Sequence, residues 1–152
     1  METGNPKSTA QIAGHPLHPM LIPFPIAFFV SGFVCDLVVW RTGSPGWATA
    51  STWLIGFGLI MAALAALAGL TDFLGSARIR GLTDAWHHML GNVLAVLIEL
   101  FNWYWRYSHG QTGIVPLGLI LSLVVVLILL FTGWKRWEMV YRHRVGVSSS
   151  GE

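Results

Sequence analysis

The sequence predicts an all-α integral membrane protein, built as an antiparallel up-down four-helix bundle. Hydrophobic residues make up 54% of the 152 residues and charged residues only 11%. A soluble domain of this size buries too little surface to cover so much apolar side chain. Four apolar runs of roughly 20 residues each are long enough to cross ~30 Å of hydrocarbon. Tryptophans near the ends of these runs are typical of the aromatic belts at membrane interfaces.

The four runs define the predicted spans in chain order. They cover residues 20–40, 53–72, 86–105 and 113–134. The connections TGSPG and SHGQTG carry turn residues, so consecutive spans are expected to be antiparallel neighbours. Residues 1–14 and 145–152 are polar and expected to be flexible, which leaves 15–144 as one four-span transmembrane domain.

The basic residues predict the orientation of the spans. Two of them, Arg41 and Arg106, flank the loops on one face. The other seven fall on the face that holds both termini: Lys7, Arg78, Arg80, Lys135, Arg136, Arg142 and Arg144. By the positive-inside rule both termini are expected in the cytoplasm. The net charge of +2 therefore reflects topology and indicates no nucleic-acid partner.

Histidines gather at one end of the predicted bundle. His15 and His18 lie in HPLHP before the first span, and His87 and His88 begin the third span. In an up-down bundle the first and third spans begin on the same face, so these side chains are expected to meet. A proline follows both His15 and His18 and favours an extended backbone at each. In a polyproline-like turn of three residues both rings would point the same way. A stiff entry of the chain into the membrane explains His15 equally well.

The third span carries a polar stripe along one helix face. At 100° per residue, five residues fall within about 40° of His88 around the helix axis: Asn92, Ala95, Glu99, Asn102 and Arg106. Unpaired polar groups in lipid cost several kcal/mol, so this face is expected to point into the bundle. His87 is expected at the headgroups or against a neighbouring helix, and Val93 and Leu100 away from the interior. Gly91 is expected to leave space beside the His88 ring.

Three carboxyl groups lie within or next to the spans. Asp36 and Glu99 either pair with Asn102 or Arg106 or mark a proton or quinone path, as intramembrane acids often do. Asp72, at the inner end of the second span, either accepts the second ring N–H of a ligating imidazole or is an exposed acid at a helix end.

Several of these segments resemble one family of bacterial membrane proteins. They are GHPLHPMLIPFP at the start, Asp36 late in the first span, GLTDF at the end of the second, His88 and Asn92 in the third, and VYRHRVGV near the end. Together they resemble the family called domain of unknown function 2231. The resemblance covers nearly all of the chain and implies a multi-pass protein of the bacterial inner membrane. Members look like small relatives of the bis-histidine b-type cytochromes, and some are joined to Rieske-type domains, which implies electron transfer.

The first hypothesis for function is a haem b protein of the membrane. His18 and His88 would be the axial ligands, with Gly91 and Asn92 beside the cofactor. A redox partner or a quinone in the lipid bilayer would then exchange electrons with the haem.

Two other classes of function compete with it. A non-haem zinc, iron or copper site would take three nitrogens and one oxygen from His15, His18, His88 and Asp72. An accessory membrane subunit would use the histidines only as anchors and hydrogen-bonding groups. The lone Cys35 excludes a cysteine-rich metal site. Because the sequence shows no nucleophilic triad, phosphate loop or hydrolase acid pair, an enzyme of the soluble type is not expected.

Overall fold

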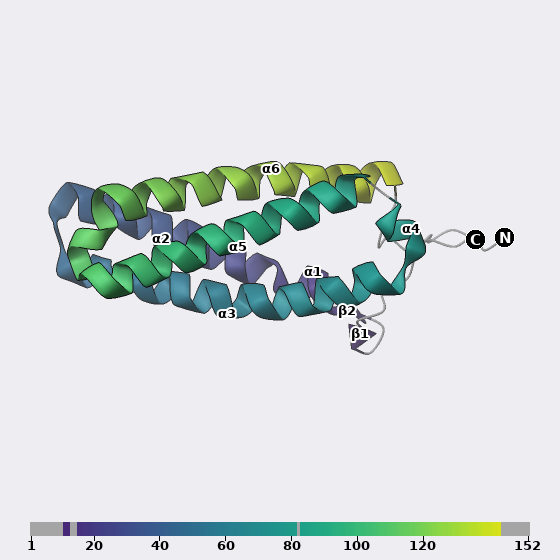
Figure 1. The fold of residues 1–152 in the computed structure, drawn as a ribbon, viewed down its shortest axis with the longest axis horizontal. Coiled ribbons are helices and arrows are strands. Elements are labelled where there is room, and N and C mark those ends of the chain that lie inside the picture. The colour runs from purple at the N-terminus through teal and green to yellow at the C-terminus, as the bar shows by residue number, and fades with distance from the viewer. Residues whose placement is uncertain (1–10, 13–14, 82, 144–152) are drawn as a thin grey trace.

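The structure, a computed structural model, describes residues 11–12, 15–81 and 83–143 (Figure 1). The elements in chain order are β1 (Gln11–Ile12), β2 (His15–Pro16), α1 (Leu17–Leu21), α2 (Pro23–Thr42), α3 (Pro45–Gly75), α4 (Ala77–Arg80), α5 (Thr83–His109), the 3₁₀ turn η1 (Gly110–Gly113), the π turn η2 (Ile114–Gly118) and α6 (Leu119–His143). Apart from the antiparallel pair β1 and β2, the described chain is helical, as predicted. Residues 1–10 and 145–152, within the segments predicted to be flexible, lie outside the described residues.

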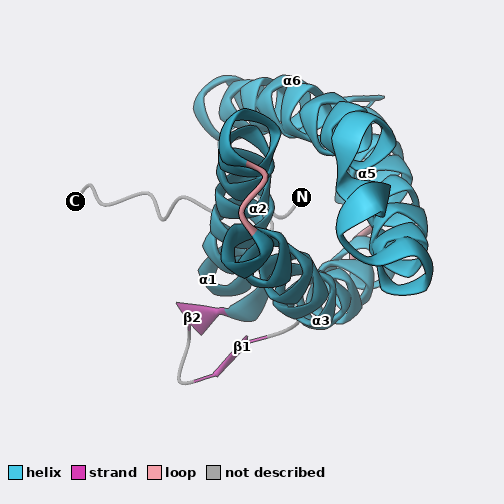
Figure 2. Cartoon of the chain, turned by 90° about the vertical axis from the view of Figure 1, so that its left-hand side faces the viewer, coloured by secondary structure: helices cyan, strands magenta, loops and turns pink. Residues whose placement is uncertain are grey.

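The long helices α2, α3, α5 and α6 surround one common axis (Figure 2). Hydrogen bonds between α5 and α6 join His88 to Thr132 near one end and Asn102 to Ser122 near the other, so these two helices are antiparallel. Figure 1 shows them side by side over most of their length. The apolar core between the helices consists of Phe29, Ile55, Ala62, Ala95 and Val125.

The outward faces of the helices are apolar. Leu67 on α3 is 66% exposed and Leu130 on α6 is 67% exposed. In water the exposure of so much apolar surface would be unfavourable, whereas lipid solvates these side chains well. The helices therefore bury small and polar residues inside and present large apolar residues outside, as membrane bundles do.

Three helical segments among the described residues are long and apolar enough to cross a membrane. They are Leu17–Thr42, Pro45–Gly75 and Thr83–Trp134, the last of 52 residues. The first two contain the first two predicted spans. The third contains both remaining predicted spans, together with η1 and η2, so length and composition alone give three segments where four were predicted.

The helix boundaries differ from the predicted ones at two connections. Gly43, at φ 65°, ends α2, and α3 already begins at Pro45 rather than at Trp53. Proline suits the first turn of a helix, because its missing N–H would have no intrahelical partner there. Residues 45–52 therefore belong to helix α3 and not to the connection before the second span.

The second difference lies between α5 and α6. The predicted fourth span begins at Gly113, but the regular helix begins only at Leu119. Val115, joined to Pro116 by a cis peptide bond, has extended dihedral angles of φ −116° and ψ 126°. A residue before proline is disfavoured in the α region, which accounts for the break.

Candidate functional site

His18 and His88 lie next to each other at one end of the bundle, although 70 positions separate them in the sequence. Their ring centroids are 6.4 Å apart, and the ring planes are nearly perpendicular at 85°. Both residues are half-buried. The up-down topology predicted this meeting, and the structure confirms it.

The ring of His18 is held by α3. Its Nδ1 lies 2.7 Å from the carbonyl oxygen of Ala65, and because a carbonyl can only accept, Nδ1 carries the proton of this bond. A Cβ placed on Gly69 would lie 2.7 Å from Nδ1 and Cε1 of the ring, so only glycine fits there. The predicted extended backbone at His18 is wrong: the residue is helical, in α1. The following proline occupies an early position of this short helix, where it needs no N–H partner.

The ring of His88 is held by α5 and α6. Its Nδ1 lies 3.3 Å from the carbonyl oxygen of Thr132. The Asn92 amide nitrogen lies 3.3 Å from Nδ1 and 3.4 Å from Nε2 of the ring and donates to the backbone carbonyl of His88 at 2.6 Å. The expectation for Gly91 is wrong. The space beside this glycine is filled by the Thr132 methyl group, because α5 and α6 pack closely here, and it does not lie open beside the His88 ring.

Of the four residues of the non-haem metal hypothesis, the structure brings His18 and His88 together. Within the part of the chain that the structure describes, no group of three His, Cys, Asp or Glu side chains could hold a metal ion. His15 is exposed, because β2 carries it on the strand pair and away from the helices. Asp72 is half-buried near the end of α3. His87 is exposed, as its position off the polar stripe predicted.

A second polar cluster, which we call the ion-pair network, occupies the other end of the bundle. Its centre is a salt bridge between Asp36 on α2 and Arg106 on α5, both fully buried. Arg106 donates from Nη1 to Oδ1 and from Nη2 to Oδ2 of Asp36, each at 2.6 Å. Such two-pronged pairing is the strongest geometry available to a guanidinium and a carboxylate.

Two serines complete the ion pair from the remaining helices. Ser51 on α3 donates to Asp36 Oδ1 at 2.5 Å and accepts from Arg106 Nη1 at 2.5 Å. Ser122 on α6 donates to Asp36 Oδ2 at 2.8 Å and accepts from Arg106 Nη2 at 2.9 Å. All four long helices therefore meet in one set of hydrogen bonds.

The ion-pair network continues along α5 toward the bundle centre. Arg106 Nε donates to Asn102 Oδ1 at 2.9 Å, and Asn102 Nδ2 donates to Glu99 Oε2 at 2.9 Å. Glu99 and Asn102 are fully buried, whereas Val93 is 51% and Leu100 50% exposed. The predicted inward direction of the stripe is confirmed. Of the two alternatives for the acids, the structure shows the pairing, with Glu99 bonded to Asn102 and Asp36 to Arg106.

The comparison with protein families decides the identity of the chain. A family model described as "Predicted membrane protein (DUF2231)" matches residues 14–149. The chain belongs to this family. No curated protein and no solved structure matches the chain. Family membership makes the DUF2231 chain a membrane protein embedded in a lipid bilayer, and the residues themselves must supply any argument about its chemistry.

Sequence reasoning missed two members of the ion-pair network in this DUF2231 chain, the two serines. Arg106 was expected both on the inward-facing polar stripe and beside an outer loop, and at 1% exposed it takes the inward position. Its place at the end of the polar stripe was the signal for an inward position. Ser51 and Ser122 gave no signal, because a serine in a membrane helix can also satisfy its hydroxyl on its own backbone.

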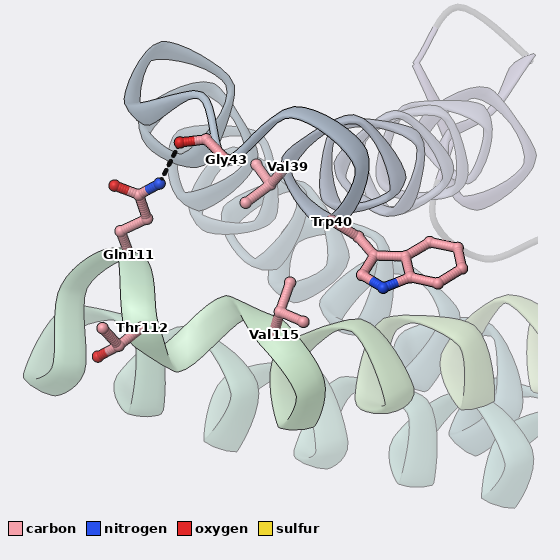
Figure 3. Close-up of a pocket in the computed structure, with 6 residues that line it drawn as sticks. All are labelled: Val39, Trp40, Gly43, Gln111, Thr112 and Val115. Atoms are coloured by element: carbon pink, nitrogen blue, oxygen red, sulfur yellow. Dashed lines mark hydrogen bonds between the residues drawn. The ribbon is translucent and has the colours of Figure 1, made fainter.

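An open depression of about 330 Å³ lies between the end of α2 and the turns η1 and η2 (Figure 3). Its lining residues are Val39, Trp40, Gly43, Gln111, Thr112 and Val115. Gln111 Nε2 donates to the carbonyl oxygen of Gly43 at 2.5 Å and so ties the two turns at this end of the DUF2231 bundle together. None of the lining side chains is acidic, basic or nucleophilic enough to suggest catalysis.

Proposed function

We propose that this chain is a small electron-transfer module that binds haem b through His18 and His88. The observation that carries the proposal is the distance of 6.4 Å between the two ring centroids. Two imidazoles that bind one metal ion from opposite sides, at about 2.0–2.1 Å from nitrogen to metal, have centroids roughly 6 Å apart. Held by these two residues, haem b would supply one-electron oxidation and reduction at its iron.

The hydrogen bonds of the two rings support the same use. Each Nδ1 faces a backbone carbonyl, Ala65 O for His18 and Thr132 O for His88. A proton held on Nδ1 leaves the lone pair on Nε2, which is the tautomer that a metal ligand requires, and the carbonyl also fixes the ring direction.

The number of converging histidines favours haem over a non-haem metal. A protein zinc, iron or copper site usually takes three or four protein ligands. No such group exists among the described residues, whereas two histidines meet. Haem needs only two axial protein ligands, because the porphyrin supplies the rest.

We further propose four membrane crossings with both termini in the cytoplasm of a bacterium. A straight helix of 52 residues would be about 78 Å long, far more than ~30 Å of hydrocarbon. Hydrogen bonds from Asn102 to Ser122 and from His88 to Thr132 support a fold-back within this segment and therefore two crossings. Because Arg106 is buried in the bundle, it no longer counts among the basic residues that flank the outer loops. Arg41 alone remains there, which strengthens the positive-inside bias.

The test is an absorption spectrum of the full-length protein purified in detergent after expression with a haem precursor. We expect a Soret band with one haem per chain, lost in His18→Ala and His88→Ala and kept in His87→Ala. Total metal analysis accompanies the spectrum. Stoichiometric metal without a Soret band, or equal loss in His87→Ala, would contradict the haem assignment.

An accessory membrane subunit is the second candidate. The observation that favours it is that both rings already bond to carbonyls of neighbouring helices, which is also a purely structural use. His18→Asn separates the two candidates, since an asparagine can donate where Nδ1 does but cannot serve as the axial ligand. If haem is bound, this variant loses it while the thermal midpoint of the apo-protein stays near that of the wild type. An unchanged spectrum in the variant would favour the structural role.

A further inference from the structure

One carboxylate oxygen of Glu99 has no hydrogen-bond partner among the residues that the structure describes. The side chain is fully buried on α5, and Oε2 accepts a hydrogen bond from Asn102. Oε1 is the buried side-chain atom for which the described residues offer no hydrogen bond. Buried polar atoms in native proteins nearly always have a partner, so this exception needs an explanation.

The nearest cation cannot supply that partner. A guanidinium has five N–H groups. Those of Arg106 are all engaged: Nε with Asn102, Nη1 with Asp36 and Ser51, and Nη2 with Asp36 and Ser122. Arg106 is therefore fully committed to the ion-pair network and has no donor left for Glu99.

The charges of the ion-pair network indicate that the Glu99 carboxyl group is neutral. Asp36 from α2 and Arg106 from α5 cancel each other, while the groups that α3 and α6 contribute, Ser51 and Ser122, do not titrate. An ionised Glu99 would add an uncompensated negative charge in the bundle interior, which is costly in a membrane. A neutral Glu99 would add none, and its proton would sit on Oε1.

We infer that Glu99 is a proton-binding site inside the membrane and carries an exchangeable proton on Oε1. Uptake joins one proton from a hydronium ion to the carboxylate and leaves one water molecule; release is the reverse. The polar side chains of Asn102, Arg106 and Asp36 extend from Glu99 toward the nearer end of α5. From Glu99 to Arg106 this row of polar side chains covers about 10 Å along the helix. The inference does not depend on haem, because it rests on the other end of the bundle.

Infrared spectroscopy of the full-length protein in lipid bilayers tests the inference. At neutral pH we expect the carbonyl stretch of a protonated carboxylic acid, shifted to lower frequency in D₂O and absent in Glu99→Gln. The matched acid control is Asp84→Asn at the start of α5, in which the band should remain. Labelling all glutamates with ¹³C should also shift the band, which assigns it to a glutamate rather than an aspartate even if Glu99→Gln does not fold.

Three results would overturn the inference. Absence of the band from the wild type would mean that Glu99 is ionised and that a bound water or cation satisfies Oε1. A band that survives in Glu99→Gln would belong to another acid. A band that does not shift after prolonged exposure to D₂O would show a proton that is bound but not exchanged.

Discussion

Arg106 and Asp36, 70 positions apart in the chain, form a two-pronged ion pair at 2.6 Å with both side chains shielded from solvent. The pair joins the α2–α3 hairpin to the α5–α6 hairpin through charge, while the serines of α3 and α6 satisfy the remaining lone pairs and protons. Such completeness matters because a buried ion pair stabilises a fold only when its hydrogen bonds are satisfied.

Removing one member of this pair should strongly destabilise the protein. Asp36→Asn or Arg106→Gln leaves the other charge buried without its partner, which costs about 3–5 kcal/mol. Thermal and denaturant unfolding in detergent measure the loss. The double variant Asp36→Leu with Arg106→Met removes both charges and should be more stable than either single variant. Two single losses below about 1 kcal/mol would show that the pair is not buried as described.

Ser51→Ala should cost less than loss of the ion pair. It removes one hydrogen bond to Asp36 and one from Arg106, and a buried polar group left short of a partner costs about 1–3 kcal/mol. The matched control is Thr49→Ala on the exposed face of α3, expected to stay within about 0.5 kcal/mol of the wild type. Equal effects of the two variants in the same unfolding assay would contradict a special role for Ser51.

Gly69→Ala should disturb the histidine pair. The added methyl group would lie 2.7 Å from the His18 ring and would push it away from Ala65 and His88. Loss of such an orienting contact typically weakens metal binding about 10- to 100-fold, and haem titration would measure the change. Gly133→Ala on α6, where none of the described residues lies within 4 Å of the new methyl group, serves as the control and should bind haem like the wild type.

Reporter fusions test the number of crossings. A fusion at Gly110 in η1 and one at Gly151 should report opposite compartments if α5 and α6 each cross the membrane. The physical reason is the length of the 52-residue segment, which one crossing cannot accommodate without leaving apolar residues in water. Alkaline phosphatase should be active only at Gly110 and green fluorescent protein only at Gly151. The same compartment at both positions would mean that the segment crosses only once.

The sequence was sufficient to predict much of the site, because membrane helices follow few rules. Helix period alone separated Glu99 from Leu100, since polar side chains in lipid must point inward. Up-down connectivity alone brought His18 and His88 to the same end. These two predictions need only the direction of each helix and the free-energy cost of exposing polar groups to hydrocarbon.

Other features depend on contacts that no local pattern encodes. The stripe predicted an inward direction for Arg106, but its two-pronged pairing with Asp36 depends on how α2 packs against α5. Ser51 looks like any small residue of a membrane helix. The space beside Gly91 depends on which residue of α6 faces it, and the sequence of α5 says nothing about Thr132. The start of α3 depends on how far the helix continues beyond the apolar run.

The separation of Asp36 and Arg106 in the chain has a consequence for synthesis. Helices α2 and α3 are synthesised well before Arg106. The first hairpin therefore enters the membrane with Asp36 hydrogen-bonded to Ser51 but without its cation. The second hairpin likewise carries a cation until it finds the first. Each hairpin therefore carries one buried charge that only the other hairpin neutralises, so neither half is complete in lipid by itself.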